Sequence, residues 1–466
     1  MSKINFLKNK NSIEKKIIKD LKNFQKIDKN NKISVLPDVH LKKGEMSPTG
    51  CVLVSSKISP SFTHLSVGSG ISAWSIEVDK GFNIKEFDSL FKFLKKKIPG
   101  SNVGNKKLHN FTEKQFENFF KFGPLMFFSK KKFSKSFLKN IENKGNFAKN
   151  LKNKISYEES VPDYLKKIAK KNFGTMGTGN TFIELHEIKE DFTNKNLFAK
   201  KLFFYIHSGI PEAYLTMFYS PRWGLHGKEF IPFEKEKWNF FSKHIIDKKS
   251  ILTKKNFFPG ASKYFGIDPE SYDGKIYLSA MAYICNIATA NRIYLATIIN
   301  KFLKKKLNIK NMSLVWDCVH DSIKIERVNN KLKIVHRHGA SPVYNDHYIN
   351  KNLNNNKNYK TIIIPSKPGG DTLIAMIKGN IGKYNNSICH GTGRLMDRPA
   401  AKLKYNHNST KKKILEKVDK LYFKMKDISG ENPNSFRSLE EIIQILEKNK
   451  LIQKQHITTP KYILKS

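Results

Sequence analysis

Cysteine is scarce in this chain of 466 residues. The four cysteines are Cys51, Cys285, Cys318 and Cys389, and no two of them form a CxxC pair. A disulfide framework or a structural zinc site needs cysteines at close, repeated spacings, so neither is indicated. The pattern favours a reducing compartment, the cytoplasm or an equivalent, and leaves an organellar location open.

Long apolar runs are missing as well. The longest fall well short of the ~18 residues that span a bilayer. The N-terminus, MSKINFLKNKNSIEKK, has no apolar signal core, and its basic residues are lysines mixed with acid, which argues against a transit peptide. We therefore expect a soluble chain without a membrane partner.

Acidic residues are also few compared with basic residues. Forty aspartates and glutamates stand against 85 lysines and arginines, which gives a formal net charge of +45. A surplus of this size suits a polyanion, and nucleic acid is the first candidate, although a general bias toward lysine and asparagine also contributes. Hydrophobic residues still make up 39% of the chain and aromatic residues 12%, so a large core can form.

Hydrophobic spacing predicts the organisation of the chain. Residues 1–30 form a basic amphipathic helix in this interpretation, and residues 31–466 form one domain. Phenylalanines at helical spacing over residues 80–170 indicate core more than RNA contact. Residues 277–306 are the clearest helix. SIKIERV and LKIVHRH form a hairpin that places His336 and His338 on one strand face, where they could be exposed.

Three histidines stand in patterns that suit chemistry. His207 ends an apolar strand in YIHSG, His320 lies between predicted strands in DCVHDS, and His390 precedes a Gly-x-Gly turn in CHGTGR. Glycines there let the backbone approach a phosphate, and Arg394 could pair with its oxygens. Two more glycine-rich turns occur in GTMGTGNTFIE and PSKPGGDT, but neither a P-loop nor a dinucleotide fingerprint is present. Taken singly, each histidine is better explained as a structural or surface residue.

The order of these stretches resembles that of the RtcB family of RNA ligases. The likeness runs from LPDVHLKKG through GTMGTGNTFIE, IHSG, AMAYICNIATANR, VHDSIKIE, HRHGAS and IIIPSKPGGDT to CHGTGRLMDR and the last residues. It implies an α/β (α+β) fold, a single large domain with mixed sheets and a deep central cleft. Members join an RNA 3′-phosphate or 2′,3′-cyclic phosphate to a 5′-hydroxyl, using GTP and manganese, with tRNA or another structured RNA as partner.

The resemblance also implies roles for particular residues. His390 would be the nucleophile that carries GMP, and Asp38 would lie beside the metals as a second catalytic residue. His207 and His320 would bind manganese. The guanylate site would comprise Asn180, Phe182, Glu184, Pro365, Ser366, Lys367, Pro368, Thr372, His390, Gly391, Thr392, Gly393 and Lys465.

Three expected metal ligands are replaced in this chain. Ser66 and Ser69 stand where the family has an aspartate and a cysteine, and Thr181 stands where it has a histidine. A hydroxyl keeps its proton near neutral pH and binds metals far more weakly than a thiolate or carboxylate. Two interpretations therefore stay open: a divergent RNA ligase with a histidine–GMP intermediate, and a catalytically impaired pseudoenzyme that serves as an RNA-binding subunit of a ribonucleoprotein.

Overall fold

Three β-sheets form the framework of the computed structural model, which describes residues 3–41, 47–63, 67–100, 108–128, 133–149, 151–161, 163–177, 179–193, 199–210, 264, 266–328, 331–343, 361–424 and 426–466. Ser66 and the hairpin turn at Asn329 and Asn330 lie outside these residues. The large sheet has the strand order β11-β12-β15-β5-β6-β4-β7, with β14 beside β15. A second sheet has the order β1-β2-β3-β9-β8, and β10 pairs with β13.

The strands combine parallel and antiparallel pairing. β14 runs parallel to β15 and β1 runs parallel to β2, whereas their other neighbours pair antiparallel. This confirms the expected mixed α/β fold, while the deep central cleft stays a prediction. The strands are β1 Lys3–Phe6, β2 Lys32–His40, β3 Thr49–Ser55, β4 Gly70–Val78, β5 Phe182–Asp191, β6 Lys200–Ser208, β7 Met312–Val319, β8 Ser322–Val328, β9 Lys331–His338, β10 Ala340–Pro342, β11 Thr361–Pro365, β12 Thr372–Ile377, β13 Ser387–Cys389, β14 Lys420–Phe423 and β15 Ile452–Lys465.

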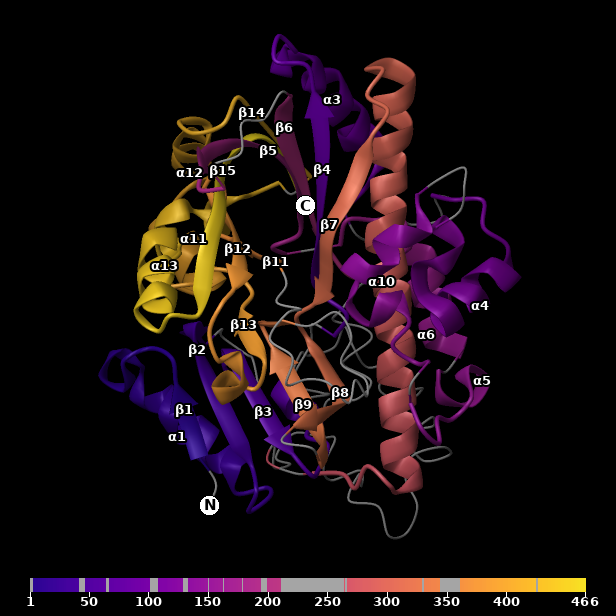
Figure 1. Ribbon diagram of the computed structural model, residues 1–466, viewed down its shortest axis with the longest axis vertical. Helices are drawn as coiled ribbons and strands as arrows, with labels where there is room; N and C mark the ends of the chain where they lie inside the picture. Colours follow the sequence, from indigo (N-terminus) through magenta and orange to yellow (C-terminus); the bar gives the residue numbers. More distant parts are fainter. Residues whose placement is uncertain are drawn as a thin grey trace.

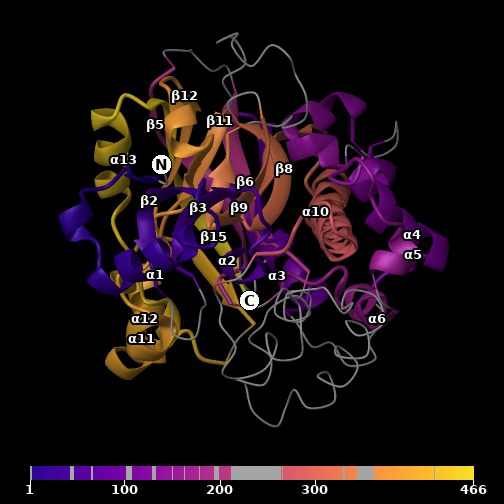
Figure 2. The same ribbon diagram turned by 90° about the horizontal axis from the view of Figure 1, so that it is seen from below.

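Helices cover the sheets from two sides (Figures 1 and 2). The long helix α10 and the shorter α4, α5 and α6 lie on one side, and α11, α12 and α13 lie on the other. Among the described residues, no helix combines the length and apolarity that a membrane span requires. The main helices are α1 Lys15–Gln25, α3 Phe87–Lys97, α4 Glu113–Phe122, α5 Tyr157–Ser160, α6 Asp163–Asn172, α10 Tyr272–Lys306, α11 Arg398–Lys404, α12 His407–Leu415 and α13 Leu439–Lys448.

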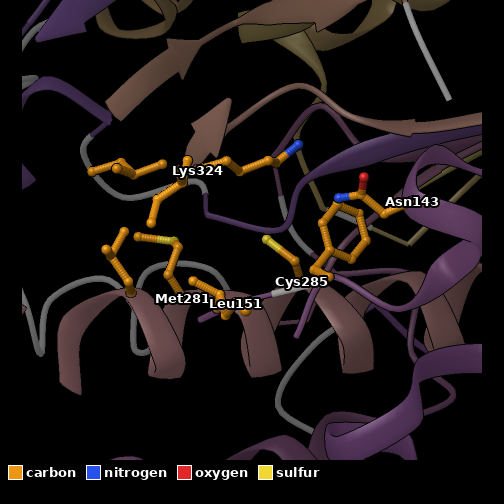
Figure 3. Close-up of a pocket in the computed structure, with 10 residues that line it drawn as sticks. Asn143, Leu151, Met281, Cys285 and Lys324 are labelled. Carbon is orange, nitrogen blue, oxygen red and sulfur yellow. The ribbon is translucent and has the colours of Figure 1, made fainter. Parts of the chain in front are cut away.

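The largest core forms around α10. The helix predicted over 277–306 is confirmed and begins five residues earlier, where Ser271 caps it. Phenylalanines from residues 80–170, among them Phe91, Phe119 and Phe147, are buried in this core, so the core interpretation is confirmed for them. A cavity between α10 and β8 (Figure 3) has a volume of about 10 Å³, which holds about one water molecule and excludes a nucleotide.

Two sequence predictions need correction. The helix expected over residues 1–30 is confined to α1, because Lys3–Phe6 instead pairs with β2 as a parallel strand. His336 and His338 are buried rather than exposed, because helix α2 (Pro60–Thr63) and the residues before it cover this face of β9. The ring centre of Phe62 lies 6.0 Å from that of His336, and Oγ of Ser47 lies 2.8 Å from Nδ1 of His338. His336 accepts a hydrogen bond from the backbone N–H of Ser59, which satisfies a ring nitrogen away from water, and burial lowers its pKa to about 4.

Candidate functional site

Asp38 and His390 form the reactive-looking pair of the structure. The fully buried Asp38 comes from β2, and His390 directly follows β13. The Nδ1 atom of His390 lies 2.8 Å from Oδ2 of Asp38, and the imidazole is 16% exposed. The carboxylate can only accept, so Nδ1 carries the proton and donates it. The other ring nitrogen, Nε2, therefore keeps its lone pair for a nucleophilic attack.

The glycine turn after His390 is shaped by its contact with β2. Gly393 has φ +74°, and a Cβ atom there would collide with the backbone oxygen of Asp38. Arg437 fixes the same contact, because its guanidinium donates to the backbone oxygens of Val39 at 2.9 Å and Arg394 at 3.0 Å. The Gly-x-Gly pattern thus serves first to bring His390 against Asp38. Nothing in the sequence marks Arg437 for this role.

Two buried atoms beside this pair lack hydrogen-bond partners within the described part of the chain. They are Oδ1 of Asp38 and Oγ1 of Thr392. Unsatisfied buried polar atoms are costly in free energy and are rare in folded proteins. Other buried atoms in the described ranges, such as Oδ1 of Asn300, also lack a partner, so these two atoms are compatible with a polar ligand beside His390 but do not by themselves indicate one.

His207, His320 and Ser69 form a hydrogen-bonded cluster next to His390. The two histidine Nε2 atoms lie 3.4 Å apart, and each lies 3.2 Å from Oγ of Ser69. The ring centres of His207 and His320 are 5.1 Å apart, and those of His320 and His390 are 4.9 Å apart. The structure therefore brings the three predicted histidines into one row.

The orientation of His207 suits a metal ligand or a hydrogen-bond acceptor. Its Nδ1 lies 3.1 Å from the backbone oxygen of Asn180 and donates to it, so Nε2 faces Ser69 and His320 with its lone pair. Burial lowers the pKa of His207 to about 3, against the opposing effect of that hydrogen bond. The ring is consequently neutral at physiological pH.

A buried arginine that the sequence reading missed holds this cluster in place. Arg292 of α10 binds both carboxylate oxygens of Asp317, at 3.0 and 2.8 Å. It also donates to the backbone oxygens of Gly68 at 3.0 Å and Ser208 at 3.2 Å, each one residue from a cluster member. Arg292 ends the AMAYICNIATANR stretch of the resemblance, but no role was predicted for it from the sequence.

The side chains of the described residues do not provide the ligands that tight binding of a manganese ion requires. The donors that converge are the imidazoles of His207 and His320 and the hydroxyl of Ser69. The carboxylate of Asp321 lies farther off, 3.8 Å from Nε2 of His320, and no thiolate is among them. The hydroxyl of Thr181 donates instead to Ser466 at 2.6 Å. Within the described ranges, no group of three or more histidine, cysteine, aspartate or glutamate side chains is arranged to hold a metal. Manganese prefers oxygen ligands and gains affinity from their charge.

We expect Ser69→Cys to create a metal site. The new sulfur would take the place of an oxygen that lies 3.2 Å from both histidine Nε2 atoms, and a thiolate is a far stronger ligand than a hydroxyl. Affinity for Co²⁺ should rise at least ~10–100-fold, since even an outer-shell partner has an effect of that size. Thiolate absorption during a Co²⁺ titration measures it, with Ser69→Ala as control. Equal affinity in the two variants would contradict the expectation.

The buried carboxylate of Glu431 binds three cationic side chains, one of which contacts the Gly179–Thr181 turn. One of its oxygens accepts from Arg394 at 2.7 Å and from Arg398 at 2.6 Å, and the other lies 3.4 Å from Nζ of Lys465. Lys465 also reaches the backbone oxygens of Gly179 and Thr181, both at 3.4 Å. Glu431 and Arg398 were not identified from the sequence, whereas Lys465 and Arg394 were.

The remaining predicted guanylate residues lie on neighbouring strands and turns. Phe182 of β5 pairs with Lys465 of β15, and its ring centre is 5.4 Å from that of His207. Glu184 is hydrogen-bonded to His186 at 2.9 Å. The turn Ser366, Lys367 and Pro368 joins Pro365 to Thr372, which face each other across β11 and β12. Gly391 lies against the backbone oxygen of Pro365.

Comparison with known proteins agrees with this arrangement. The family model described as "tRNA-splicing ligase RtcB" matches residues 20–213 and 240–466. Proteins with the same name from Thermococcus kodakarensis, Archaeoglobus fulgidus and Nanoarchaeum equitans are 25%, 25% and 23% identical over 38%, 59% and 62% of this chain. These matches span 39%, 55% and 58% of the relatives' own lengths. Because the family model covers most of its length, the chain belongs to the RtcB family.

Proposed function

We propose that this chain is an RNA ligase that joins an RNA 3′-phosphate or 2′,3′-cyclic phosphate to a 5′-hydroxyl through GMP carried on His390. The observation that carries the proposal is the 2.8 Å hydrogen bond between Asp38 and Nδ1 of His390. It prepares the opposite ring nitrogen for attack on phosphorus. The family and its relatives share the name tRNA-splicing ligase, which supports RNA as the partner.

The first step in this proposal is transfer of GMP to His390. The lone pair of Nε2 attacks the α-phosphorus of GTP, a P–N bond forms, and the bond to the leaving pyrophosphate breaks. The imidazole becomes positively charged as the bond forms, and the carboxylate of Asp38 stabilises that charge through the proton on Nδ1. GMP then passes to the RNA 3′-phosphate, and the 5′-hydroxyl displaces it.

The cations around Glu431 supply positive charge for the phosphates. Arg394, Arg398 and Lys465 share the single buried carboxylate of Glu431, while Asp397 and Glu184 act on them from farther away. Arginine forks and lysine ammonium groups both suit phosphate oxygens. We assign the guanylate itself to the surroundings of Asn180, Phe182 and Glu184 and to the turns at Pro365–Thr372 and Gly391–Gly393.

A second candidate function rests on a different observation. Ser69 stands in the cluster where a metal-binding cysteine is expected, and the hydroxyl of Thr181 is bound to Ser466. A chain with these replacements could act as a pseudoenzyme that binds RNA within a ribonucleoprotein. Its formal net charge of +45 would then be its main functional property.

Incubation with α-labelled GTP tests the proposal. We expect an acid-labile label on the wild-type protein, with and without added Mn²⁺ compared in parallel, and none on His390→Ala. His456→Ala is the matched control, because His456 also lies close to an aspartate, Asp191, at 3.2 Å. A folded wild-type protein that binds RNA but takes no label would instead support the pseudoenzyme.

A further inference from the structure

Helix α12, the residues just after it and the turn between β11 and β12 present a group of lysines near the candidate site. Lys411, Lys412 and Lys417 are exposed, and Lys413 and Lys367 are half-buried. We call these five residues the α12 lysine surface. Within the described ranges none of them forms an ion pair, and Lys411 contacts the ring of Phe423 instead, at 5.8 Å. Other lysines, such as Lys402 beside Asp427 at 3.6 Å, are partly neutralised.

Direct contacts connect this surface to His390. Gly391, the residue after the histidine, lies against the backbone of Pro365, where the turn that contains Lys367 begins. Gly369 of the same turn packs against Ile414 of α12. On its other side, α12 is joined to the segment of Glu431 by a 2.9 Å hydrogen bond from Asn432 to Thr410. The α12 lysine surface therefore adjoins both the turn between Pro365 and Thr372 and the segment of Glu431.

Like charges are crowded at the inner edge of the surface. Burial lowers the pKa of Lys367, and the charges of Lys417 and Lys413 lower it further, while Glu440 and Asp371 oppose them. Crowding of this kind costs free energy in the unbound protein. A polyanion that lies across Lys367, Lys413 and Lys417 would relieve the repulsion.

The outer face of α12 is hollowed. The groove is shallow and open to solvent, and it is lined by Asn408, Lys411, Lys412, Leu415 and Glu416. Two exposed ammonium groups and an amide in it can donate to phosphate oxygens, while the carboxylate of Glu416 opposes them. An extended chain could follow it away from the turn at Lys367.

We propose that the α12 lysine surface binds the phosphate backbone of the RNA strand whose end reaches His390. The inference rests on the proposed function, because it identifies the route by which the RNA substrate enters the same site. Lysine binds phosphates as a point charge without reading bases, so the contact holds RNA in position independently of its sequence.

Charge reversal at this surface tests the inference. We expect K413E/K417E to weaken binding of a 3′-phosphorylated single-stranded RNA by roughly 10–100-fold near physiological salt, and to flatten the plot of log affinity against log salt by ~0.7 for each lost phosphate contact. Labelling of His390 by GTP should persist, because neither lysine belongs to the guanylate site. K15E/K19E is the matched control: it reverses two exposed lysines four residues apart on α1.

The possible outcomes separate the inference from the function on which it rests. Equal losses of RNA affinity in K413E/K417E and K15E/K19E would overturn the inference, because binding would then depend on net charge and not on this surface. No loss of affinity in either variant would overturn it as well. If K413E/K417E is poorly folded, K411E/K412E on the exposed groove should show the same selective loss. A wild-type protein without a GTP label contradicts the proposed ligase, yet still allows the lysine surface to bind RNA.

Discussion

Asp38→Asn should slow the labelling of His390 by GTP about 10²–10⁴-fold, the range over which positioned proton acceptors and orienting carboxylates act. The carboxylate of Asp38 can only accept a hydrogen bond, and it lies 2.8 Å from Nδ1 of His390. An asparagine amide can turn its NH₂ group toward Nδ1 and stabilise the tautomer with the proton on Nε2. The attacking nitrogen would then have no lone pair. Single-turnover labelling with α-labelled GTP measures the rate.

The matched control is Asp191→Asn, which alters an aspartate close to the histidine of a different pair, His456. It should label at the wild-type rate. Calorimetry should show GTP binding to Asp38→Asn within a few-fold of wild type, because Asp38 acts on the nucleophile and asparagine has nearly the same shape. A normal labelling rate in a folded Asp38→Asn protein would contradict the orienting role.

Local patterns in the sequence predicted the elements that carry the site. Alternating and helical spacings are short-range signals, so they placed β6, the strands β8 and β9 and most of α10 correctly. The same patterns failed at the N-terminus, where the pairing of β1 with β2 is a contact between distant residues. They also failed for His336, whose burial depends on Ser59 and Phe62, which are far from it in the sequence.

The family resemblance predicted the candidate catalytic residues, but it did not predict the residues that hold them in position. Arg292, Arg437 and Glu431 contact residues distant in the sequence, the last of them Lys465 of β15. The sequence does not show which residue a single charged side chain will bind, because folding alone brings the two partners together. Hydrogen bonds from Arg292 hold the backbone beside Ser69 and His207, where the resemblance leads one to expect metal ligands.

Glu431→Gln should lower the free energy of unfolding by about 3–5 kcal/mol, the usual cost of removing one partner from a buried ion pair. Glu431 is fully buried, and its loss would leave Arg394, Arg398 and Lys465 without their shared carboxylate. Urea denaturation measures the effect. Glu441→Gln is the control: its partner is Lys8 at 2.6 Å, its side chain is 40% exposed, and its removal should cost less than about 1 kcal/mol.

The pH dependence of the same stability follows from the pKa of Glu431. Burial raises that pKa, but Lys465, Arg398 and Arg394 outweigh burial and lower it from 4.5 to about 2. A group whose pKa is lower in the folded state stabilises the fold above its unfolded pKa. The contribution of Glu431 is therefore complete above about pH 4.5 and is lost as the pH falls toward 2. The stability difference between wild type and Glu431→Gln should shrink over that interval, and a difference that stays constant down to pH 2 would show that shape, rather than charge, holds the three cations.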